Sequence, residues 1–163
     1  MGDYPRFSKS LSHEELIEHF HLEETDKQFI AQFRGDTNRH GVAVLLKSLL
    51  YLGYFPPHLS QVPTEVKSFI ARQLNLSENP SEHYLWNSGT RGDNFAQIRK
   101  KTGFRFPTVS DKEDLENWLR QTGAREAITF SALFECAIYR LRSLWIELPD
   151  RLTPHGVGRA TAM

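Results

Sequence analysis

Positive charge is concentrated in the fifteen residues from Arg91 to Arg105. The stretch carries a net charge of +4, because one carboxylate, Asp93, opposes five basic side chains. The basic residues are Arg91, Arg99, Lys100, Lys101 and Arg105. Lysine and arginine bind the phosphates of nucleic acids and release counterions from them. The pattern predicts contact with duplex DNA, although a solvated helix face without a ligand would carry the same residues.

Two amide side chains lie in the same stretch, on a helix that we expect from about Asn94 to Thr102. Asn94 and Gln97 carry the donor and acceptor pair that can address the edge of a base in the major groove. We therefore expect this helix to be the groove-reading element, with the neighbouring basic residues on phosphates.

A second candidate contact comes from the segment between Thr25 and Leu52, which has helix-turn-helix form with a short glycine-containing turn. Its second helix is a poor recognition helix, because Leu and Val occupy several of its faces. Arg34, Arg39 and Lys47 could still reach phosphates from the ends of this helix. An ion pair between Arg39 and Asp36 is an equally good interpretation.

The sequence offers little for catalysis or for a metal. His19 and His21 are two residues apart and point to different sides of a helix, with no second ligand cluster elsewhere. Cys136 lies within an apolar helical stretch and is expected to pack there. There is no glycine-rich phosphate loop and no serine nucleophile elbow. We expect no catalytic residue, no metal and no cofactor, and thus no enzyme.

Composition limits the remaining classes of function. The 163 residues include 20 basic and 20 acidic ones, so the net charge is zero and a basic face must be balanced by an acidic one. Six acidic residues and no Lys or Arg lie between His13 and Asp26, where solvation is expected. One cysteine excludes an internal disulfide, and no apolar run approaches the length of a membrane span. With no signal peptide at its start, the chain is expected in the cytoplasm, without a membrane partner.

Hydrophobic periodicity predicts an all-α fold with several helices. Ser12 and Glu15 form a capping box before the first helix, and Ser110 and Glu113 form a second one. The other helices are expected at about 25–33, 37–52, 63–75, 94–102 and 130–145. Because Val and Leu recur on more than one side of 37–52, this helix should be central and buried.

The helices suggest two packed subdomains. The first is expected over residues 1–76 and the second over 94–152, with a linker at 77–93 that Tyr84 and Trp86 anchor. Residues 153–163 have no apolar stripe and are expected to form a disordered tail.

Short motifs along the chain resemble the N-terminal domain of Tn-three family replicative transposases, a domain often catalogued as one of unknown function. They are the runs 34–43, 52–56, 62–66 and 70–74, Tyr84-x-Trp86, Gln97-Ile98-Arg99, Gly103-Phe104-Arg105 and Ile146-Glu147-Leu148-Pro149. The order and spacing of these motifs extend the resemblance over about residues 7–151.

The resemblance implies a helical module that recognises the terminal inverted repeats of a transposon, in double-stranded DNA. It also implies a chain truncated before the catalytic domain, which in the family follows the Leu-Pro pair. One departure stands out, because residues 89–95 have lost most of the basic charge that the family carries there. The alternatives are a non-catalytic protein-interaction module, with full-length transposase as its partner, or a truncated relic without DNA binding.

Overall fold

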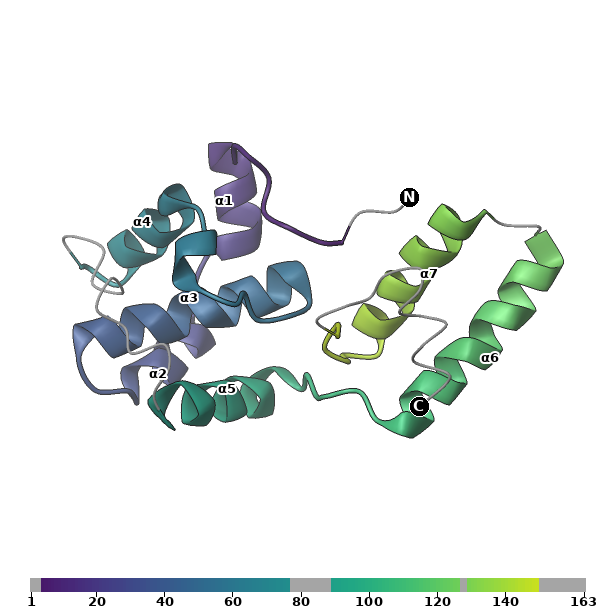
Figure 1. Cartoon of the computed structure of the whole chain (residues 1–163). Helices are drawn as coiled ribbons and strands as arrows, with labels where there is room; N and C mark the ends of the chain where they lie inside the picture. The colour runs from purple at the N-terminus through teal and green to yellow at the C-terminus, as the bar shows by residue number, and fades with distance from the viewer. Residues whose placement is uncertain (1–3, 77–88, 127–128, 150–163) are drawn as a thin grey trace. The chain divides into compact units, whose positions relative to one another are not determined.

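The computed structural model describes residues 4–76, 89–126 and 129–149 (Figure 1). In these ranges the regular elements are helices, which confirms the all-α prediction. They are α1 (His13–Phe20), α2 (Glu24–Ala31), α3 (Asp36–Leu52), the short 3₁₀ helix η1 (Leu59–Gln61), α4 (Thr64–Gln73), α5 (Gly89–Thr102), α6 (Val109–Glu126) and α7 (Phe130–Ser143). The predicted anchors Tyr84 and Trp86 and the predicted tail at 153–163 lie outside the described residues.

The chain forms two compact units. The larger unit is Arg6–Thr102, and the smaller unit is Gly103–Met163 together with Met1–Pro5. The boundary therefore follows Thr102, whereas the sequence-based division started a second subdomain at residue 94. The physical reason is that α5 packs in the larger unit, where Ile98 is fully buried and Asn94 donates a hydrogen bond to the Asn38 side chain at 2.8 Å.

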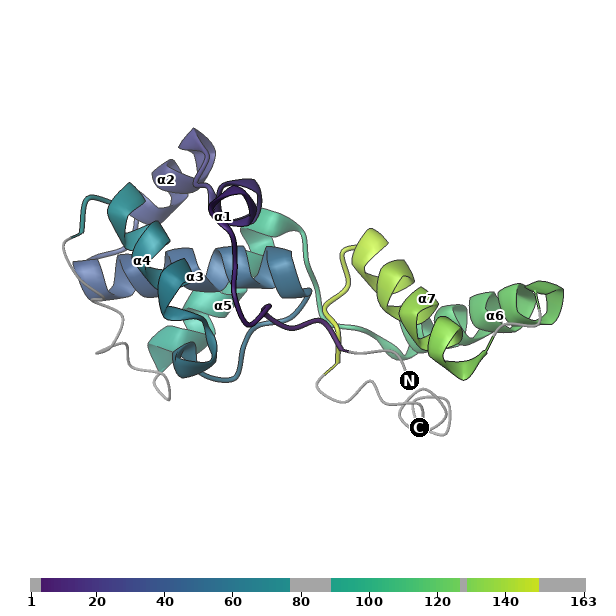
Figure 2. The same cartoon turned by 90° about the horizontal axis from the view of Figure 1, so that it is seen from above.

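Helix α3 is the centre of the larger unit, as its sequence predicted. Figures 1 and 2 show α1, α2, α4 and α5 arranged around it. Val42, Leu45, Leu46 and Leu49 are fully buried, because apolar residues on several faces let α3 contact a neighbour on each side. The helix ends at Gly53, whose φ of 87° is a left-handed conformation that glycine adopts without strain.

Local capping fixes the start of the first two helices. The Ser12 side chain accepts a hydrogen bond from the Glu15 backbone N–H at 3.2 Å, which is the N-cap half of the predicted capping box. Leu11 and Leu16 are both buried beside this cap, at the positions of a hydrophobic staple. At the start of α2, the Asp26 side chain accepts from the Glu23 backbone N–H at 2.9 Å, a cap that the sequence analysis did not predict.

In the smaller unit, α6 and α7 lie side by side (Figures 1 and 2). The chain segments before α6 and after α7 meet through a parallel bridge between Arg105 and Ile146. The cap of α6 differs from the prediction, because Thr108 and Asp111 exchange hydrogen bonds, at 3.1 Å and 2.7 Å, in place of Ser110 and Glu113. The threonine hydroxyl is the better placed acceptor, since α6 begins one residue before Ser110.

None of the described helices combines the length and the apolar character that crossing a membrane would need.

The central position of α3 gives a first prediction. Replacing Leu46 with Ala should lower the free energy of unfolding by about 2–5 kcal/mol, because it leaves a cavity in a fully buried site. Urea denaturation followed by circular dichroism measures the change. Ile17→Ala is the control, since this side chain on α1 is exposed and its truncation should stay within about 0.5 kcal/mol. Equal stability of the two variants would contradict the assignment of α3 as the core helix.

Candidate nucleic-acid interface

Helix α5 carries most of the candidate contacts and has two distinct faces. Its inward face includes Asn94 and Ile98, which are buried against the rest of the larger unit. Its outward face consists of exposed residues that recur with helical spacing. The exposed residues are Gly92, Asp93, Ala96, Gln97 and Lys100. This outward face is what α5 can offer to a ligand.

A buried ionic cluster attaches α5 to α2 and α3. We call it the Asp26 cluster, and it consists of Asp26, Lys47 and Lys101. The Asp26 carboxylate has Lys47 Nζ at 2.9 Å from Oδ2 and Lys101 Nζ at 3.5 Å from Oδ1. Lys101 also lies over the ring of Phe29, 5.5 Å from its centroid. The cluster joins three helices through one carboxylate.

The electrostatics of the cluster keep Asp26 ionised. Burial alone would raise the pKa of Asp26. Hydrogen bonds from Lys47 and from the Glu23 backbone, together with the charges of Lys47 and Lys101, outweigh burial and lower this pKa below its usual value. Both lysines thus share one carboxylate within the fold, and the Asp26 cluster keeps one positive charge in excess.

An aromatic stack attaches α5 on another side. We define it as Phe55, Phe95 and Arg99. The rings of Phe55 and Phe95 are parallel, with an interplanar angle of 1° and centroids 3.9 Å apart. The Arg99 guanidinium lies 5.2 Å from the Phe55 centroid and 5.7 Å from the Phe95 centroid, within range of a cation–π interaction. The loop after α3 is thereby joined to α5.

The predicted contact residues on α5 differ in how far the fold buries them. Asn94 is only 3% exposed and already bonded to Asn38, so burial excludes it from direct contact with a base and corrects that prediction. Arg99 and Lys101 are partly covered and engaged in the aromatic stack and the Asp26 cluster. Gln97 and Lys100 are exposed. The side chain of Arg91 lies outside the described residues.

Arg39 lies at the start of α3, where the expected ion pair with Asp36 is present and the phosphate contact stays a prediction. Its Nε donates a hydrogen bond to the Phe33 carbonyl at 2.7 Å, and its Nη1 lies 4.0 Å from Asp36 Oδ1. The side chain is still 41% exposed. Arg39 therefore has intramolecular partners and retains a surface toward solvent.

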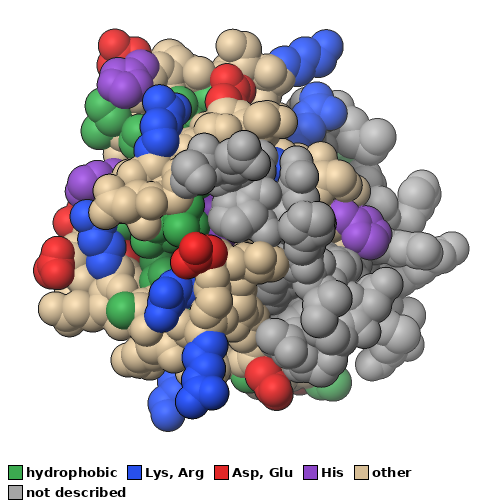
Figure 3. Space-filling model, turned by 90° about the vertical axis from the view of Figure 1, so that its left-hand side faces the viewer, with side chains coloured by type: hydrophobic (Ala, Val, Ile, Leu, Met, Phe, Trp, Pro, Cys, Tyr) green, Lys and Arg blue, Asp and Glu red, His purple; other side chains and the backbone are tan. Residues whose placement is uncertain are grey.

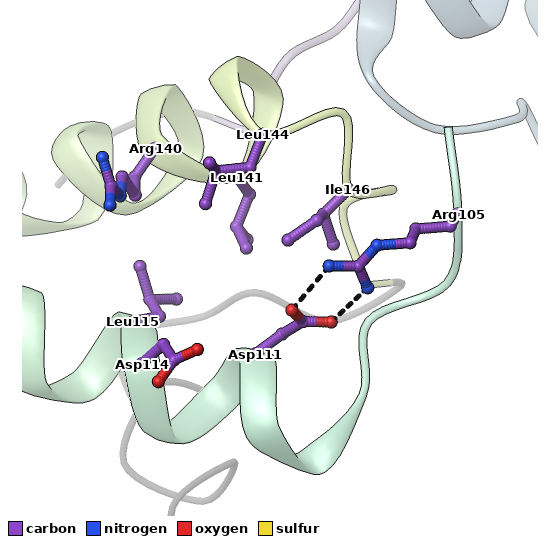
Figure 4. Close-up of a pocket in the computed structure, with 8 residues that line it drawn as sticks. All are labelled: Arg105, Asp111, Asp114, Leu115, Arg140, Leu141, Leu144 and Ile146. Carbon is purple, nitrogen blue, oxygen red and sulfur yellow. Dashed lines mark hydrogen bonds and ion pairs between the residues drawn. The ribbon is translucent and has the colours of Figure 1, made fainter. Parts of the chain in front are cut away.

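Arg105 belongs to the smaller unit and forms a two-point ion pair with Asp111 (Figure 4). Its Nη2 lies 2.7 Å from Asp111 Oδ1, and its Nη1 lies 2.5 Å from Oδ2. The hydrogen bonds from Arg105 hold the pKa of Asp111 well below its usual range. Because this carboxylate already occupies the guanidinium, Arg105 is poorly placed to bind a phosphate.

The ion pair lines a cavity of about 380 Å³ between α6 and α7. Leucine and isoleucine side chains from the two helices and the following segment form its apolar part (Figure 4). The residues that line it are Arg105, Asp111, Asp114, Leu115, Arg140, Leu141, Leu144 and Ile146. Among the described residues that line this cavity there is no histidine, cysteine or serine.

Charge on the larger unit is mixed. Figure 3 views this unit from the end at which α3 begins, and basic side chains on this face alternate with acidic and hydrophobic ones. Among the residues that the structure describes, no group of three or more His, Cys, Asp or Glu side chains is arranged to hold a metal ion. A polyanion would therefore meet separate basic side chains on this face rather than a continuous basic surface.

Sequence reasoning missed Asp26, which it assigned to the solvated acidic segment. The structure buries this side chain to 7% exposure. A signal was present, because Asp26 precedes Phe29, Ile30 and Phe33 by three, four and seven residues and so lies on the apolar face of α2. A carboxylate on that face needs a buried cation, and Lys47 on the apolar helix α3 supplies it.

Gly92 is the other residue that sequence reasoning overlooked. It lies inside α5, has no left-handed φ, and a Cβ added there would meet no atom within 4 Å. Glycine at such a position costs about 0.5–1 kcal/mol relative to alanine. Packing among the described residues therefore gives no reason for glycine at this exposed site.

Comparison of the sequence with known proteins identifies its family. Residues 1–153 match the family described as a domain of unknown function, DUF4158. The chain belongs to this family. It is also similar to the transposase for transposon Tn1546 from Enterococcus faecium, with 28% identity over 131 residues, which are 80% of this chain and 13% of that protein.

Two further transposases are similar over shorter ranges. The transposase for transposon gamma-delta from Escherichia coli (strain K12) is 39% identical over 91 residues, 55% of this chain and 9% of that protein. The transposase for transposon Tn501 from Pseudomonas aeruginosa is 32% identical over 88 residues, 54% of this chain and 9% of that protein. The matched part of this chain thus spans only 9–13% of the length of these three relatives.

The Asp26 cluster gives a prediction with a pH dependence. Asp26→Asn should lower the free energy of unfolding at pH 7 by about 3–5 kcal/mol, because Lys47 would stay buried without its counter-charge. The folded-state pKa of Asp26 is lowered, so its contribution is complete above the unfolded pKa of about 3.9 and is lost as the pH falls through the folded value.

The stability difference between wild type and Asp26→Asn should therefore be full at neutral pH and shrink below about pH 4. Urea titrations across this pH range measure it. Glu24→Gln is the control, because Glu24 is exposed on the same helix. A difference that stays constant from neutral to acid pH would argue against an ionised Asp26 in the folded chain.

Proposed function

We propose that this chain is the DNA-binding module of a transposase-related protein and that it recognises the terminal inverted repeats of a transposon. The observation that carries the proposal is the outward face of α5, where Gln97 and Lys100 are exposed on a helix that two separate sets of contacts hold in place. The similarity to three transposases supports the same assignment.

The outward face of α5 suits the major groove. The groove is wide enough to admit an α-helix. Amide side chains can hydrogen-bond to its base edges, and basic side chains can bind the phosphates beside it. Lys100 is exposed and forms no ion pair with a described carboxylate. Arg99 flanks the same face, and Lys101 shares its charge with Asp26, so we assign it a weaker contact.

The proposed contact set is therefore narrower than the sequence suggested. We propose Gln97 and Lys100 as the main contacts, with Arg99 beside them, and we keep Arg91 on the strength of the sequence alone. Asn94 and Lys101 hold α5 on the larger unit. Arg39 and Arg105 have partners within the fold and contribute less.

The proposal assigns DNA binding, and not transposition chemistry, to this chain, because the match covers only 9–13% of each transposase. A cytoplasmic location fits a DNA-binding protein whose Cys136 is a free thiol.

A second function, a protein-interaction module, rests on the surface of the smaller unit. Of the seven large hydrophobic side chains that are exposed among the described residues, six lie in this unit. They are Phe106, Val109, Phe130, Tyr139, Leu144 and Trp145. Exposed apolar side chains are common at protein interfaces, and the rest of a full-length transposase is the partner that this second proposal names.

The DNA-binding proposal predicts marked salt sensitivity. If about four phosphates are neutralised, the logarithm of the affinity should fall with the logarithm of salt concentration with a slope of about −3.6. Fluorescence anisotropy with duplexes that carry a transposon end measures this slope. Absence of binding at about 50 mM salt, where phosphate contacts are strong, would eliminate this function and favour the protein-interaction module.

Lys100 separates binding from folding. Lys100→Ala should flatten the salt slope by about 0.9, which corresponds to one phosphate contact, and should change stability by no more than about 0.5 kcal/mol. Lys9→Ala is the matched control, because Lys9 is also exposed but precedes α1. If Lys100→Ala kept the wild-type slope, Lys100 would not contact a phosphate and the proposed contact set on α5 would be wrong.

A further inference from the structure

The outward face of α5 consists of two parallel lines of residues. Gly92, Ala96 and Lys100 follow one another at intervals of four, and so do Asp93 and Gln97. Residues four apart lie above one another on a helix, so each line presents its side chains side by side to a ligand. The first line is two small residues and a cation, and the second is a carboxylate and an amide.

The second line suits base edges rather than phosphates. The carboxylate of Asp93 would be repelled by a phosphate, whereas it can accept a hydrogen bond from the amino group of cytosine. Gln97 is exposed and forms no hydrogen bond with the described residues, so its amide oxygen and amide nitrogen are both available. That pair matches the N6 donor and N7 acceptor of adenine in the major groove.

The first line suits the sugar–phosphate backbone. Lys100 can reach a phosphate, and the two residues before it in the line have small side chains or none. Gly92 has open space where a Cβ would be and an ordinary helical φ. Its glycine therefore lowers helix stability with no gain in packing among the described residues. Close passage of a DNA strand against the helix would give this glycine a function.

We propose that Gln97 reads an adenine in the major groove and that Gly92 is a positioning residue, which lets one DNA strand approach α5 closely enough for that contact. This inference rests on the proposed function, because it names the base and the approach at the same helix. It adds that sequence preference comes from the line of Asp93 and Gln97. The distance between the helix and the DNA depends on the absence of a side chain at Gly92.

The base assignment can be tested by selecting preferred sites from randomised duplexes with wild type, Gln97→Ala and Gln121→Ala. Gln121 is an exposed glutamine on α6 and serves as the matched control. Gln97→Ala should lose about 5–150-fold of discrimination at one adenine position, the range for a bidentate base contact, and Gln121→Ala should keep it. Replacing that adenine with 7-deazaadenine should weaken binding by wild type and leave Gln97→Ala unaffected.

The approach of the DNA strand can be tested with Gly92→Ala. This change should raise the melting temperature of the larger unit by about 2–8 °C, because alanine favours the helix, and should weaken binding to the selected site. Asn117→Ala also replaces an exposed helix residue by alanine, on α6, and should leave affinity unchanged. In the double variant, Gly92→Ala should cause little further loss once Gln97 is Ala, because both act on one contact.

The outcomes distinguish failure of the proposed DNA-binding function from failure of this inference alone. If the wild type binds no duplex at all, the proposed function fails and this inference fails with it. If the wild type binds and Gln97→Ala keeps the same base preference, or Gly92→Ala keeps wild-type affinity, the inference is overturned and the DNA-binding function stands.

Discussion

One buried carboxylate, Asp26, determines where α5 lies. A carboxylate cannot be removed from water without compensation, and here two lysines from different helices and a backbone N–H provide it. The carboxylate also accepts the hydrogen bond that caps α2, so one side chain fixes both the start of α2 and the attachment of α5. An apolar contact could slide along the helix, whereas an ion pair with hydrogen bonds specifies one register. The aromatic stack restrains α5 on another side, and together they leave its outward face defined.

This arrangement divides the basic run into residues that hold the helix and residues that can act on a ligand. Lys101 and Arg99 have partners within the larger unit, while Lys100 between them faces solvent. Three consecutive basic residues on a helix point in three directions 100° apart, so they cannot all serve one surface. Charge counted along the sequence overstates the charge that any one ligand would meet.

The helices could be predicted from the sequence because their signals are local. Ser12 caps α1 and Gly53 ends α3 through interactions within a few residues, and the apolar faces of α3 already indicate that it is central. The start of α5 was placed too late, at Asn94 rather than Gly89, because Gly89, Gly92 and Asp93 are residues typical of loops. The burial of Asn94 and Asp26 depends on Asn38 and Lys47, which lie 56 and 21 residues away in the chain, and no local pattern specifies such partners. The unit boundary at Thr102 has the same origin, since it follows from where α5 packs.

The smaller unit is discontinuous in sequence, and this affects the order in which the protein can assemble. The Tyr4 hydroxyl donates a hydrogen bond to the Pro149 carbonyl, and these residues are 145 positions apart. During synthesis the larger unit is complete once Thr102 has emerged, whereas Tyr4 can bond to Pro149 only after the chain has been made beyond α7. The hydrogen bond between Tyr4 and Pro149 is therefore among the last native contacts to form. Closing so long a loop costs chain entropy, and the already folded larger unit shortens the flexible distance that remains to be closed.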